Sequence, residues 1–256
     1  GMNFQPDFVW GKPRSAIGQH SLFDSVRGAT KRLDSSSNGG ESTASSSLIS
    51  FDTNGFTFGN ESGNNNNETN VAWCWKAGGA ASDIASSSTG VSAASRSVNT
   101  AAGFSIVTYT MSSSTIAIPH GLSSAPKMAI VKRTNTTSDW FVYNTVISGK
   151  GRGFLNDPAI FDNSGMPTFG ATDFTFQDSD PFSSGSVVVY FFADVAGYQK
   201  IGTYDGDGGT NNQISLGFQP RFLIIKLAST GGQYWNIMDD KRLDSSVEKV
   251  LYANRT

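Results

Sequence analysis

An internal similarity constrains the fold of this 256-residue chain more than any other feature. Residues 4–12 begin Phe-Gln-Pro and continue as an apolar run that ends in lysine, and residues 218–226 do the same. A looser third copy occupies residues 125–132. Self-similarity of this kind indicates one supersecondary unit that is built more than once along the chain.

The spacing of the copies supports a repeat of about 95 residues. Lys132 and Lys226 lie 94 positions apart, and so do Phe104 and Tyr198, which open matching segments. Lys12 and Lys132 lie 120 positions apart, because the first copy contains extra low-complexity sequence. A one-residue slip in register would turn a core face toward water, so constant spacing demands similar strands. We therefore expect Lys132 to superpose on Lys226.

Two further matches fall in the same frame. Residues 31–36 read KRLDSS and are repeated letter for letter at residues 241–246. Trp140 and Trp235 occupy matching places 95 positions apart and are expected to superpose.

These matches predict the domain organisation. Residues 1–79 form a partial first repeat, 103–196 a complete second repeat, and 197–256 a partial third repeat that packs with the second. Residues 80–102, which are rich in Ala and Ser, are expected to be a linker because they lack bulky side chains. A β unit cut inside its sheet exposes strand edges. Either the partial repeats complement each other, or they pair with neighbouring domains.

The residue pattern predicts an all-β chain built as antiparallel β-sandwiches with long polar loops. Short aromatic and β-branched runs are bounded by Gly, Pro, Asn, Asp and Ser, and no stretch keeps a 3.6-residue period over three turns. Residues 34–47 and 59–70 are too polar to bury their cost of ordering, so both are expected to be surface loops.

Charge excludes several classes of function. The chain has 19 basic and 21 acidic residues, 16% in all, with a net charge of -2. This balance opposes a general electrostatic grip on nucleic acid or on anionic lipid. No apolar run is long enough for a membrane-spanning helix, and no signal-peptide pattern is present. The single cysteine, Cys74, excludes an internal disulfide framework and is expected to be a buried free thiol.

Catalytic chemistry finds little support. His120 lies in a turn signature and is expected in a turn or at the surface, whereas His20 begins a strand and is expected to be structural. Neither accompanies a nucleophile motif. No catalytic residue, metal site or cofactor is expected.

Three carboxylate pairs are the candidates for glycoside hydrolysis, which needs two flanking acids. They are Asp178 with Asp180, Asp205 with Asp207, and Asp239 with Asp240. Each pair lies in turn-like polar sequence, so solvated turn residues are the favoured interpretation. Asp205 also opens a sequence that lacks the later ligands of an EF-hand, which favours an Asp-Gly turn over calcium binding.

The candidate ligand-binding residues are two tryptophans and a polar turn. Indoles stack on sugars when exposed, although core packing is the favoured role for Trp140 and Trp235. A binding surface is otherwise expected among the polar loops. The candidates there are Asp205, Asp207, Asn211 and Asn212.

The combined motifs resemble an uncharacterised repeat module of marine bacteriophage structural proteins, of the tail-fibre or tail-associated kind. The residues that carry the resemblance are Phe-Gln-Pro before an apolar strand, residues 71–79, residues 102–109, and Gly197-Tyr198 with Gly202-x-Tyr204. The chain departs from the Thr-Gly-Asn-Gly that such modules often carry after the opening strand. The resemblance implies a virion location, a β-rich scaffold and no catalytic residue.

We therefore expect a non-enzymatic virion or tail-fibre-like module that binds host glycans or other virion proteins and that also forms homo-oligomers. A polysaccharide-degrading glycosidase that uses an Asp pair and a passive architectural spacer are the alternatives.

Overall fold

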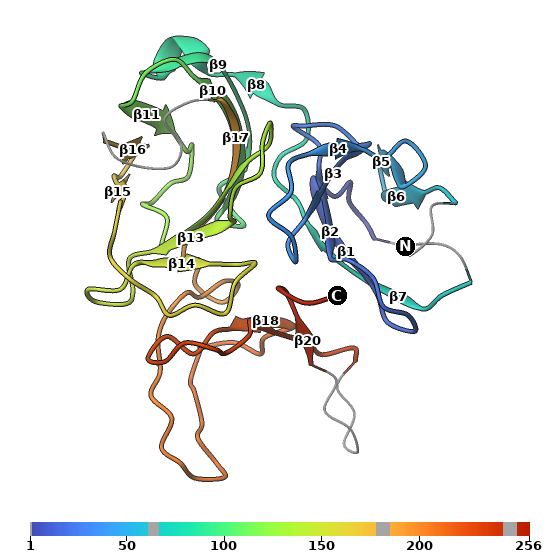
Figure 1. Ribbon diagram of the computed structural model, residues 1–256, viewed down its shortest axis with the longest axis vertical. Helices are drawn as coiled ribbons and strands as arrows, with labels where there is room; N and C mark the ends of the chain where they lie inside the picture. The colour runs from blue at the N-terminus through green and yellow to red at the C-terminus, as the bar shows by residue number, and fades with distance from the viewer. Residues whose placement is uncertain (1, 61–66, 178–184, 243–249) are drawn as a thin grey trace.

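The computed structural model describes residues 2–60, 67–177, 185–242 and 250–256 (Figure 1). The described chain is all-β, as predicted, and its one helical turn is the 3-10 segment η1 (Ala85–Ser87). All strand pairs are antiparallel. The second member of the first predicted glycosidase pair, Asp180, lies outside the described residues, as does its partner Asp178.

The strands form five sheets. The five-stranded sheet has the order β4-β3-β2-β1-β7, with β4 (Ser42–Thr43), β3 (Lys31–Asp34), β2 (Ser21–Asp24), β1 (Phe8–Pro13) and β7 (Asn70–Trp75). The seven-stranded sheet has the order β14-β13-β12-β17-β10-β9-β8, with β14 (Arg152–Phe154), β13 (Phe141–Asn144), β12 (Met128–Arg133), β17 (Gly185–Phe192), β10 (Phe104–Met111), β9 (Val91–Asn99) and β8 (Ser82–Asp83). Three sheets are smaller. One has the order β11 (Ile116–Pro119), β16 (Asp173–Phe176) and β15 (Thr168–Phe169), and another has the order β18 (Phe222–Ile225), β19 (Asn236–Asp239) and β20 (Leu251–Tyr252). The last consists of β5 (Leu48–Asp52) and β6 (Gly55–Phe58).

Three hairpin units with matching registers organise the chain: the first contains β1–β7, the second β8–β17 and the third β18–β20. Phe8 lies opposite Asp24 in the first, Met128 opposite Asn144 in the second, and Phe222 opposite Asp239 in the third. In Figure 1 the units surround a common centre. The correspondence agrees with a repeat, but the repeat itself stays a prediction.

One hydrophobic core joins the three units, and we call it the central core. Phe8 and Trp73 of the first unit, Phe104 and Tyr190 of the second, and Ile237 of the third all belong to it. Each of these side chains is at least nine-tenths buried. No unit encloses this apolar surface alone, so the three units fold as one body.

The second and first units each contain a further core on the other sheet face. The sandwich core of the second unit lies between the seven-stranded sheet and the β11-β16-β15 sheet and includes Val107, Ile118 and Phe174. The first-unit core is much smaller, with only Val9, Phe23 and Leu48 fully buried. Cys74 packs against this smaller core, on the face opposite Trp73 and Trp75, as strand alternation predicts. It is a free thiol but is only partly buried, whereas full burial was expected, because the small first-unit core does not cover it completely. Burial raises the pKa of the Cys74 thiol to about 12.

Indole hydrogen bonds tie each unit to the one before it. Trp140 Nε1 donates to the carbonyl of Asp34 at 2.9 Å, and Trp235 Nε1 donates to the carbonyl of Phe154 at 2.7 Å. Asp34 and Phe154 hold equivalent places, since each pairs with the first residue of its unit's second strand. The two tryptophans therefore form equivalent joints between consecutive units.

Two lysines, one fully buried and one half-buried, form a second set of joints. The Nζ atom of Lys132 donates to the carbonyls of Asn38 at 3.1 Å and Ser138 at 2.7 Å, so it links the second unit to the first. Lys226 links the third unit to the second through the carbonyl of Pro158 at 3.3 Å. The loop of residues 34–47 is thus held by contacts with the second unit.

Residues 80–102 are not the predicted linker. They contain β8 and β9, and the nine residues of β9 pair along β10. The small side chains of these residues did not predict strand β9, because a strand is held by backbone hydrogen bonds and these do not depend on side-chain size. Ala94 and Ser97 are buried in this strand.

The KRLDSS identity does not mark equivalent positions in the part of the third unit that is described. Arg242 bonds Asp239 in the turn after β19, as Arg27 bonds Asp24 after β2, whereas Arg32 lies in strand β3. The matching residues 243–246 lie outside the described residues.

The expected copy of strand β10 in the third unit is also not a strand. Residues 202–217 belong to no described strand and are exposed along nearly their whole length. His120 corrects another expectation, since the ring is buried and not at the surface. His120 Nδ1 accepts a hydrogen bond from the Leu122 N–H at 3.1 Å, so it does hold a turn.

His20 makes the stability of this fold sensitive to acid. The Trp10 indole donates to His20 Nδ1 at 2.9 Å, and burial lowers the pKa of His20 to about 3, reinforced by the charge of Lys12. Between about pH 6.5 and about pH 3 the unfolded chain binds a proton that the folded chain excludes. The free energy of unfolding therefore falls as the pH falls through this window.

We predict that His20→Gln flattens this decline. The difference in unfolding free energy between wild type and variant should change by up to about 5 kcal/mol across the window. Urea unfolding at a series of pH values measures it, and titrations common to both proteins cancel. Parallel pH profiles would contradict the assignment.

Candidate functional site

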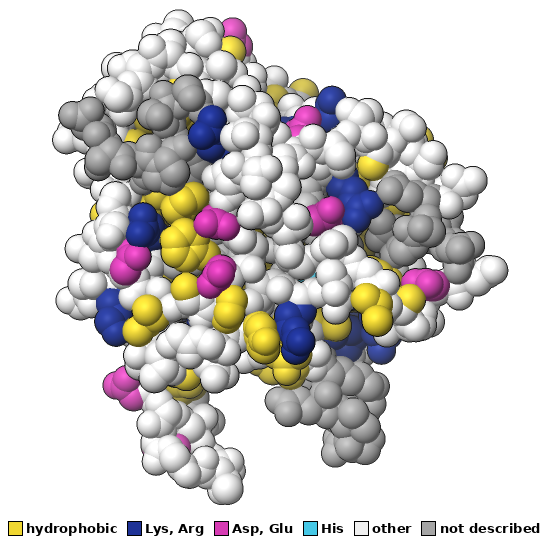
Figure 2. All heavy atoms as spheres, viewed as in Figure 1, with side chains coloured by type: hydrophobic (Ala, Val, Ile, Leu, Met, Phe, Trp, Pro, Cys, Tyr) yellow, Lys and Arg dark blue, Asp and Glu magenta, His cyan; other side chains and the backbone are white. Residues whose placement is uncertain are grey.

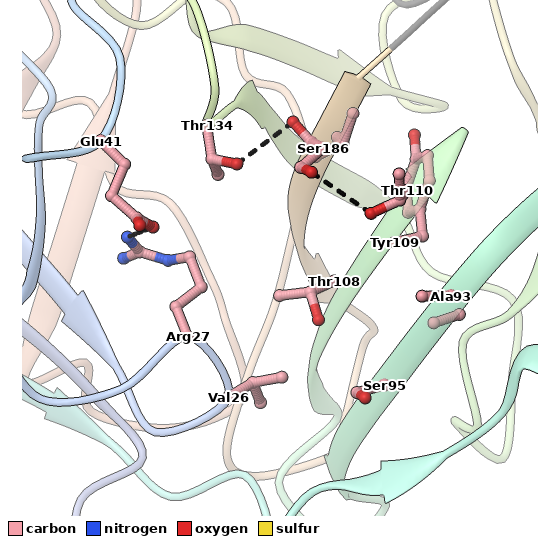
Figure 3. Close-up of a pocket in the computed structure, with 12 residues that line it drawn as sticks. Val26, Arg27, Glu41, Ala93, Ser95, Thr108, Tyr109, Thr110, Thr134 and Ser186 are labelled. Carbon is pink, nitrogen blue, oxygen red and sulfur yellow. Dashed lines mark hydrogen bonds and ion pairs between the residues drawn. The ribbon is translucent and has the colours of Figure 1, made fainter. Parts of the chain in front are cut away.

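A polar pocket lies where the first unit meets the seven-stranded sheet (Figure 3). Its volume is about 290 Å³. The lining residues come from the turn after β2, the loop before β4, and strands or strand ends of the second unit: Val26, Arg27, Glu41, Ala93, Ala94, Ser95, Thr108, Tyr109, Thr110, Thr134, Ser186 and Val187.

The pocket exists because one face of β10 changes character along its length. Phe104 and Ile106 point into the central core, whereas the next residues in the same alternation are Thr108 and Thr110. On β17, Tyr190 packs into the central core and Ser186 reaches the pocket. Apolar packing therefore stops part of the way along the sheet, and hydroxyl groups line the space beyond it.

Three of the hydroxyl groups are fixed by each other or by the backbone. Thr110 Oγ1 and Ser186 Oγ lie 3.2 Å apart, and Thr134 Oγ1 donates to the carbonyl of Ser186 at 3.2 Å (Figure 3). Ser95 and Thr108 are half-buried in the same pocket. Hydroxyl groups both donate and accept, so this wall suits a neutral polar ligand.

The opposite wall is held in place by a buried charged cluster. Arg27 Nε lies 2.5 Å from Asp24 Oδ2, and Arg27 Nη1 lies 3.1 Å from Glu41 Oε2. The Tyr190 hydroxyl donates to Asp24 Oδ2 at 2.7 Å. The cluster therefore joins the first unit to the second directly beneath the pocket.

The pKa values of two members of the cluster, Arg27 and Tyr190, are shifted by their surroundings. Burial alone would lower the pKa of Arg27, but the charges of Asp24 and Glu41 outweigh it and raise that pKa. Burial raises the pKa of Tyr190 well above its ordinary value. The guanidinium therefore stays charged and the phenol stays neutral near pH 7.

The third unit contains a similar cluster in a different setting. Asp239 Oδ2 accepts from Arg242 Nε at 2.5 Å and from the Trp73 indole at 3.0 Å. Trp73 of β7 occupies the place that Tyr190 has in β17, since they lie opposite Trp10 and Ile130 in equivalent strands. The same type of joint thus connects the first unit to the third.

The structure places the predicted ligand residues in two different environments. Trp140 is 0% exposed and Trp235 5%, so neither is available for stacking on a sugar. Both serve the joints between units instead, because a buried indole needs a hydrogen-bond acceptor. Asp205, Asp207, Asn211 and Asn212 are exposed in the segment 202–217, where Asn212 Nδ2 donates to the Asp205 carbonyl at 2.7 Å.

Three of the described carboxylates from the candidate pairs have structural partners. Asp239 is held by Arg242, and Asp240 lies 3.2 Å from Arg221. Asp207 accepts the Gly209 N–H at 2.8 Å, as expected of an Asp turn. Within residues 2–60, 67–177, 185–242 and 250–256, no three His, Cys, Asp or Glu side chains gather as a metal site, and no helix has the length and apolarity to cross a bilayer.

Sequence reasoning did not identify the pocket. The available signal was the change from Phe104 and Ile106 to Thr108 and Thr110 at alternate positions, which marks the end of an apolar face. The other wall, with Arg27 and Glu41, comes from a distant part of the chain and gives no local signal.

We predict that Arg27→Met destabilises the protein by about 3 to 5 kcal/mol, because it leaves Asp24 buried without its cation. Arg221→Met is the matched control, since the Arg221 side chain is 78% exposed in its ion pair with Asp240. The control should change stability by less than about 1 kcal/mol. Chemical denaturation measures both, and equal effects would argue against a structural role for the cluster.

Comparison with known proteins gives a family and no further relative. No curated protein and no solved structure matches the chain. A family model described as "Domain of unknown function (DUF7483)" matches residues 1–256. The chain therefore belongs to the DUF7483 family.

Proposed function

We propose that this chain is a non-enzymatic binding and structural module of a virion, of the tail-fibre kind, and that its pocket holds one sugar unit of a host-surface glycan. The observation that carries the proposal is the wall of hydroxyl groups on β9, β10 and β17 opposite a fixed Arg27–Glu41 pair. Sugars are neutral ligands that both donate and accept hydrogen bonds, and such a wall matches them.

The shape of the pocket supports a small ligand. Its volume of about 290 Å³ lies near the lower end of ligand sites. Val26 and Ala93 provide apolar contacts for the faces of a sugar ring, while Ser95 and Thr108 provide hydroxyl groups. Arg27 and Glu41 already bond each other, so a ligand meets a wall that needs no rearrangement.

The pocket lining favours binding over hydrolysis. A glycosidase needs two carboxylic acids that flank the bond to be broken. Glu41 is the only carboxylate in the lining, and it forms ion pairs with Arg27 and with Lys31. A paired carboxylate that also supports a wall is a poor general acid, which argues against the glycosidase alternative at this place.

The virion setting rests on the sequence resemblance and agrees with the surface. Figure 2 shows a face made mainly of uncharged polar and backbone atoms, with Lys, Arg, Asp and Glu side chains scattered singly or in small groups. Such a surface suits contact with neutral glycans or with other virion proteins better than contact with nucleic acid.

We expect saturation-transfer NMR with a panel of bacterial surface sugars to detect binding. The double variant Thr108→Val with Ser95→Ala should weaken the affinity for the sugar by about tenfold or more, because each lost hydrogen bond contributes about 1 kcal/mol. Thr115→Val is the matched control, since Thr115 is exposed and lies outside the pocket.

Two outcomes would overturn the assignment. Binding that survives the double variant unchanged would place the ligand elsewhere, and the Asp205 to Asn212 turn would then be the next site to mutate. Release of reducing sugar from the polysaccharide would instead favour an enzyme.

A further inference from the structure

The third unit bears a long exposed arm, residues 202–217, which projects from the body at the bottom of Figure 1. Two of its apolar side chains face solvent, with Tyr204 49% and Ile214 41% exposed. The arm has two limbs, one around Tyr204 and one around Ile214, joined by a turn rich in Gly and Asp. Exposed apolar side chains on two extended limbs indicate a segment that lacks its packing partner.

The arm corresponds in sequence to two strands of the second unit, β10 and β11, each of which pairs with a different strand. Residues 201–204 read Ile-Gly-Thr-Tyr and match residues 106–109 of β10, Ile-Val-Thr-Tyr, with one extra residue between Tyr198 and Ile201. Ile201 packs against the central core as Ile106 does. The second limb, residues 214–216, precedes β18 much as residues 118–122 precede β12.

In the second unit these two strands complete the sandwich. β10 pairs with β17, and β11 pairs with β16. Two of their side chains, Tyr109 and Ile118, then lie buried in the sandwich core. Tyr204 and Ile214 are the matching apolar residues of the arm.

The first unit has the acceptor strands without the strands that would pair with them. β7 pairs with β1 as β17 pairs with β12, and the β5-β6 hairpin corresponds to β15-β16. Among the described residues no strand pairs with the second edge of β7 at residues 71–75, or with the second edge of β6. Phe56 and Phe58 of β6 are only partly buried against the small first-unit core.

We propose that the arm of one copy of this chain completes the first unit of a second copy, by adding one limb to β7 and the other to β6. An exposed strand edge is a template for such addition, and main-chain hydrogen bonds with alternate side-chain contacts provide the affinity. The apolar residues of the arm then cover Phe56 and Phe58 and enlarge the first-unit core.

The occupant is a second copy because the arm and β7 of one chain lie apart in Figure 1, with β18 and β20 between them. Each chain has one arm and one acceptor face, so every copy both donates and accepts. Such a contact closes into a ring or continues as a filament, depending on the rotation between copies. This inference does not rest on the proposed glycan site.

The second unit also predicts the register of the pairing. Val107 of β10 lies opposite Val189 of β17, and Val189 lies opposite Val131 of β12. The equivalent place in β7 is held by Ala72, which lies opposite Gly11 of β1. Because Gly202 matches Val107, Gly202 of one copy is expected opposite Ala72 of the other.

The first test compares molar mass in solution by size-exclusion chromatography with light scattering. Wild type is expected at two or more chain masses, increasing with concentration. Thr203→Pro with Ile214→Pro should reduce it to one chain mass, because proline cannot donate to a sheet ladder. Gly206→Pro with Gly209→Pro, in the turn between the limbs, is the matched control and should keep the wild-type mass.

The second test measures the register directly, in chains that carry Cys74→Ser. A chain with Ala72→Cys is mixed with a chain with Gly202→Cys under mild oxidation, and a covalent pair of the two chains is expected, since opposite Cα atoms of paired strands lie within disulfide range. Gly206→Cys in place of Gly202→Cys should give much less product. All the substituted arm residues are exposed, so thermal unfolding should be unchanged below the oligomer's dissociation concentration.

Three results would overturn the proposal. They are a single chain mass for wild type at every concentration, an oligomer that the limb prolines leave intact, and equal cross-linking at positions 202 and 206.

Discussion

The central core is held together by indole and lysine side chains that each reach back to the preceding unit. Trp140 and Trp235 donate to the carbonyls of Asp34 and Phe154, and Lys132 and Lys226 reach carbonyls in the same preceding units. An unpaired carbonyl or ammonium in an apolar interior is costly, so each joint stabilises only the native arrangement of the units. Hydrophobic burial drives the units together, and these polar joints select one arrangement among the many that would bury apolar surface.

The buried charged clusters extend this logic to the edges of the core. Asp24, Arg27 and Tyr190 connect the first unit to the second, while Asp239, Arg242 and Trp73 connect the first to the third. Buried ion pairs contribute little net stability compared with apolar packing, but removal of one partner is expensive. Their value lies in fixing positions, and the first cluster fixes one wall of the pocket. The pocket is thus a consequence of how two units are joined.

Corresponding strands of the units differ in whether they are paired on one side or on both. β17 is paired on both sides and its residues from Val187 to Phe192 are buried, whereas β7 is paired along one side in the described structure. The sandwich core of the second unit is large because β10 and β11 contribute to it, and the first-unit core is small where such strands do not contribute. Because similar units are completed to different extents, backbone N–H and C=O groups that pair with no other described strand are concentrated at a few strand edges. This concentration makes those edges the natural places for assembly.

Sequence alone predicted the all-β class and the antiparallel hairpins, which the structure confirms, and it predicts that Lys132 superposes on Lys226 and Trp140 on Trp235. These follow from apolar alternation and from constant spacing, both of which are local properties of the chain. It also indicated that Cys74 would point away from Trp73. The strand β9 escaped prediction because Ala and Ser carry little side-chain signal, and backbone pairing with β10 decides its structure.

Only the tertiary structure decided what the equivalent residues do. Trp140 lies in the core and not at a surface because a carbonyl of another unit, more than a hundred residues earlier, accepts its indole proton. Arg27 borders a pocket, whereas Arg242, in the matching turn, lies over Trp73, since different strands pack against the two turns. Residues 106–109 form a strand and the similar residues 201–204 begin an exposed arm. In each case the local sequence is nearly the same, and the difference comes from the partner that packing brings to it.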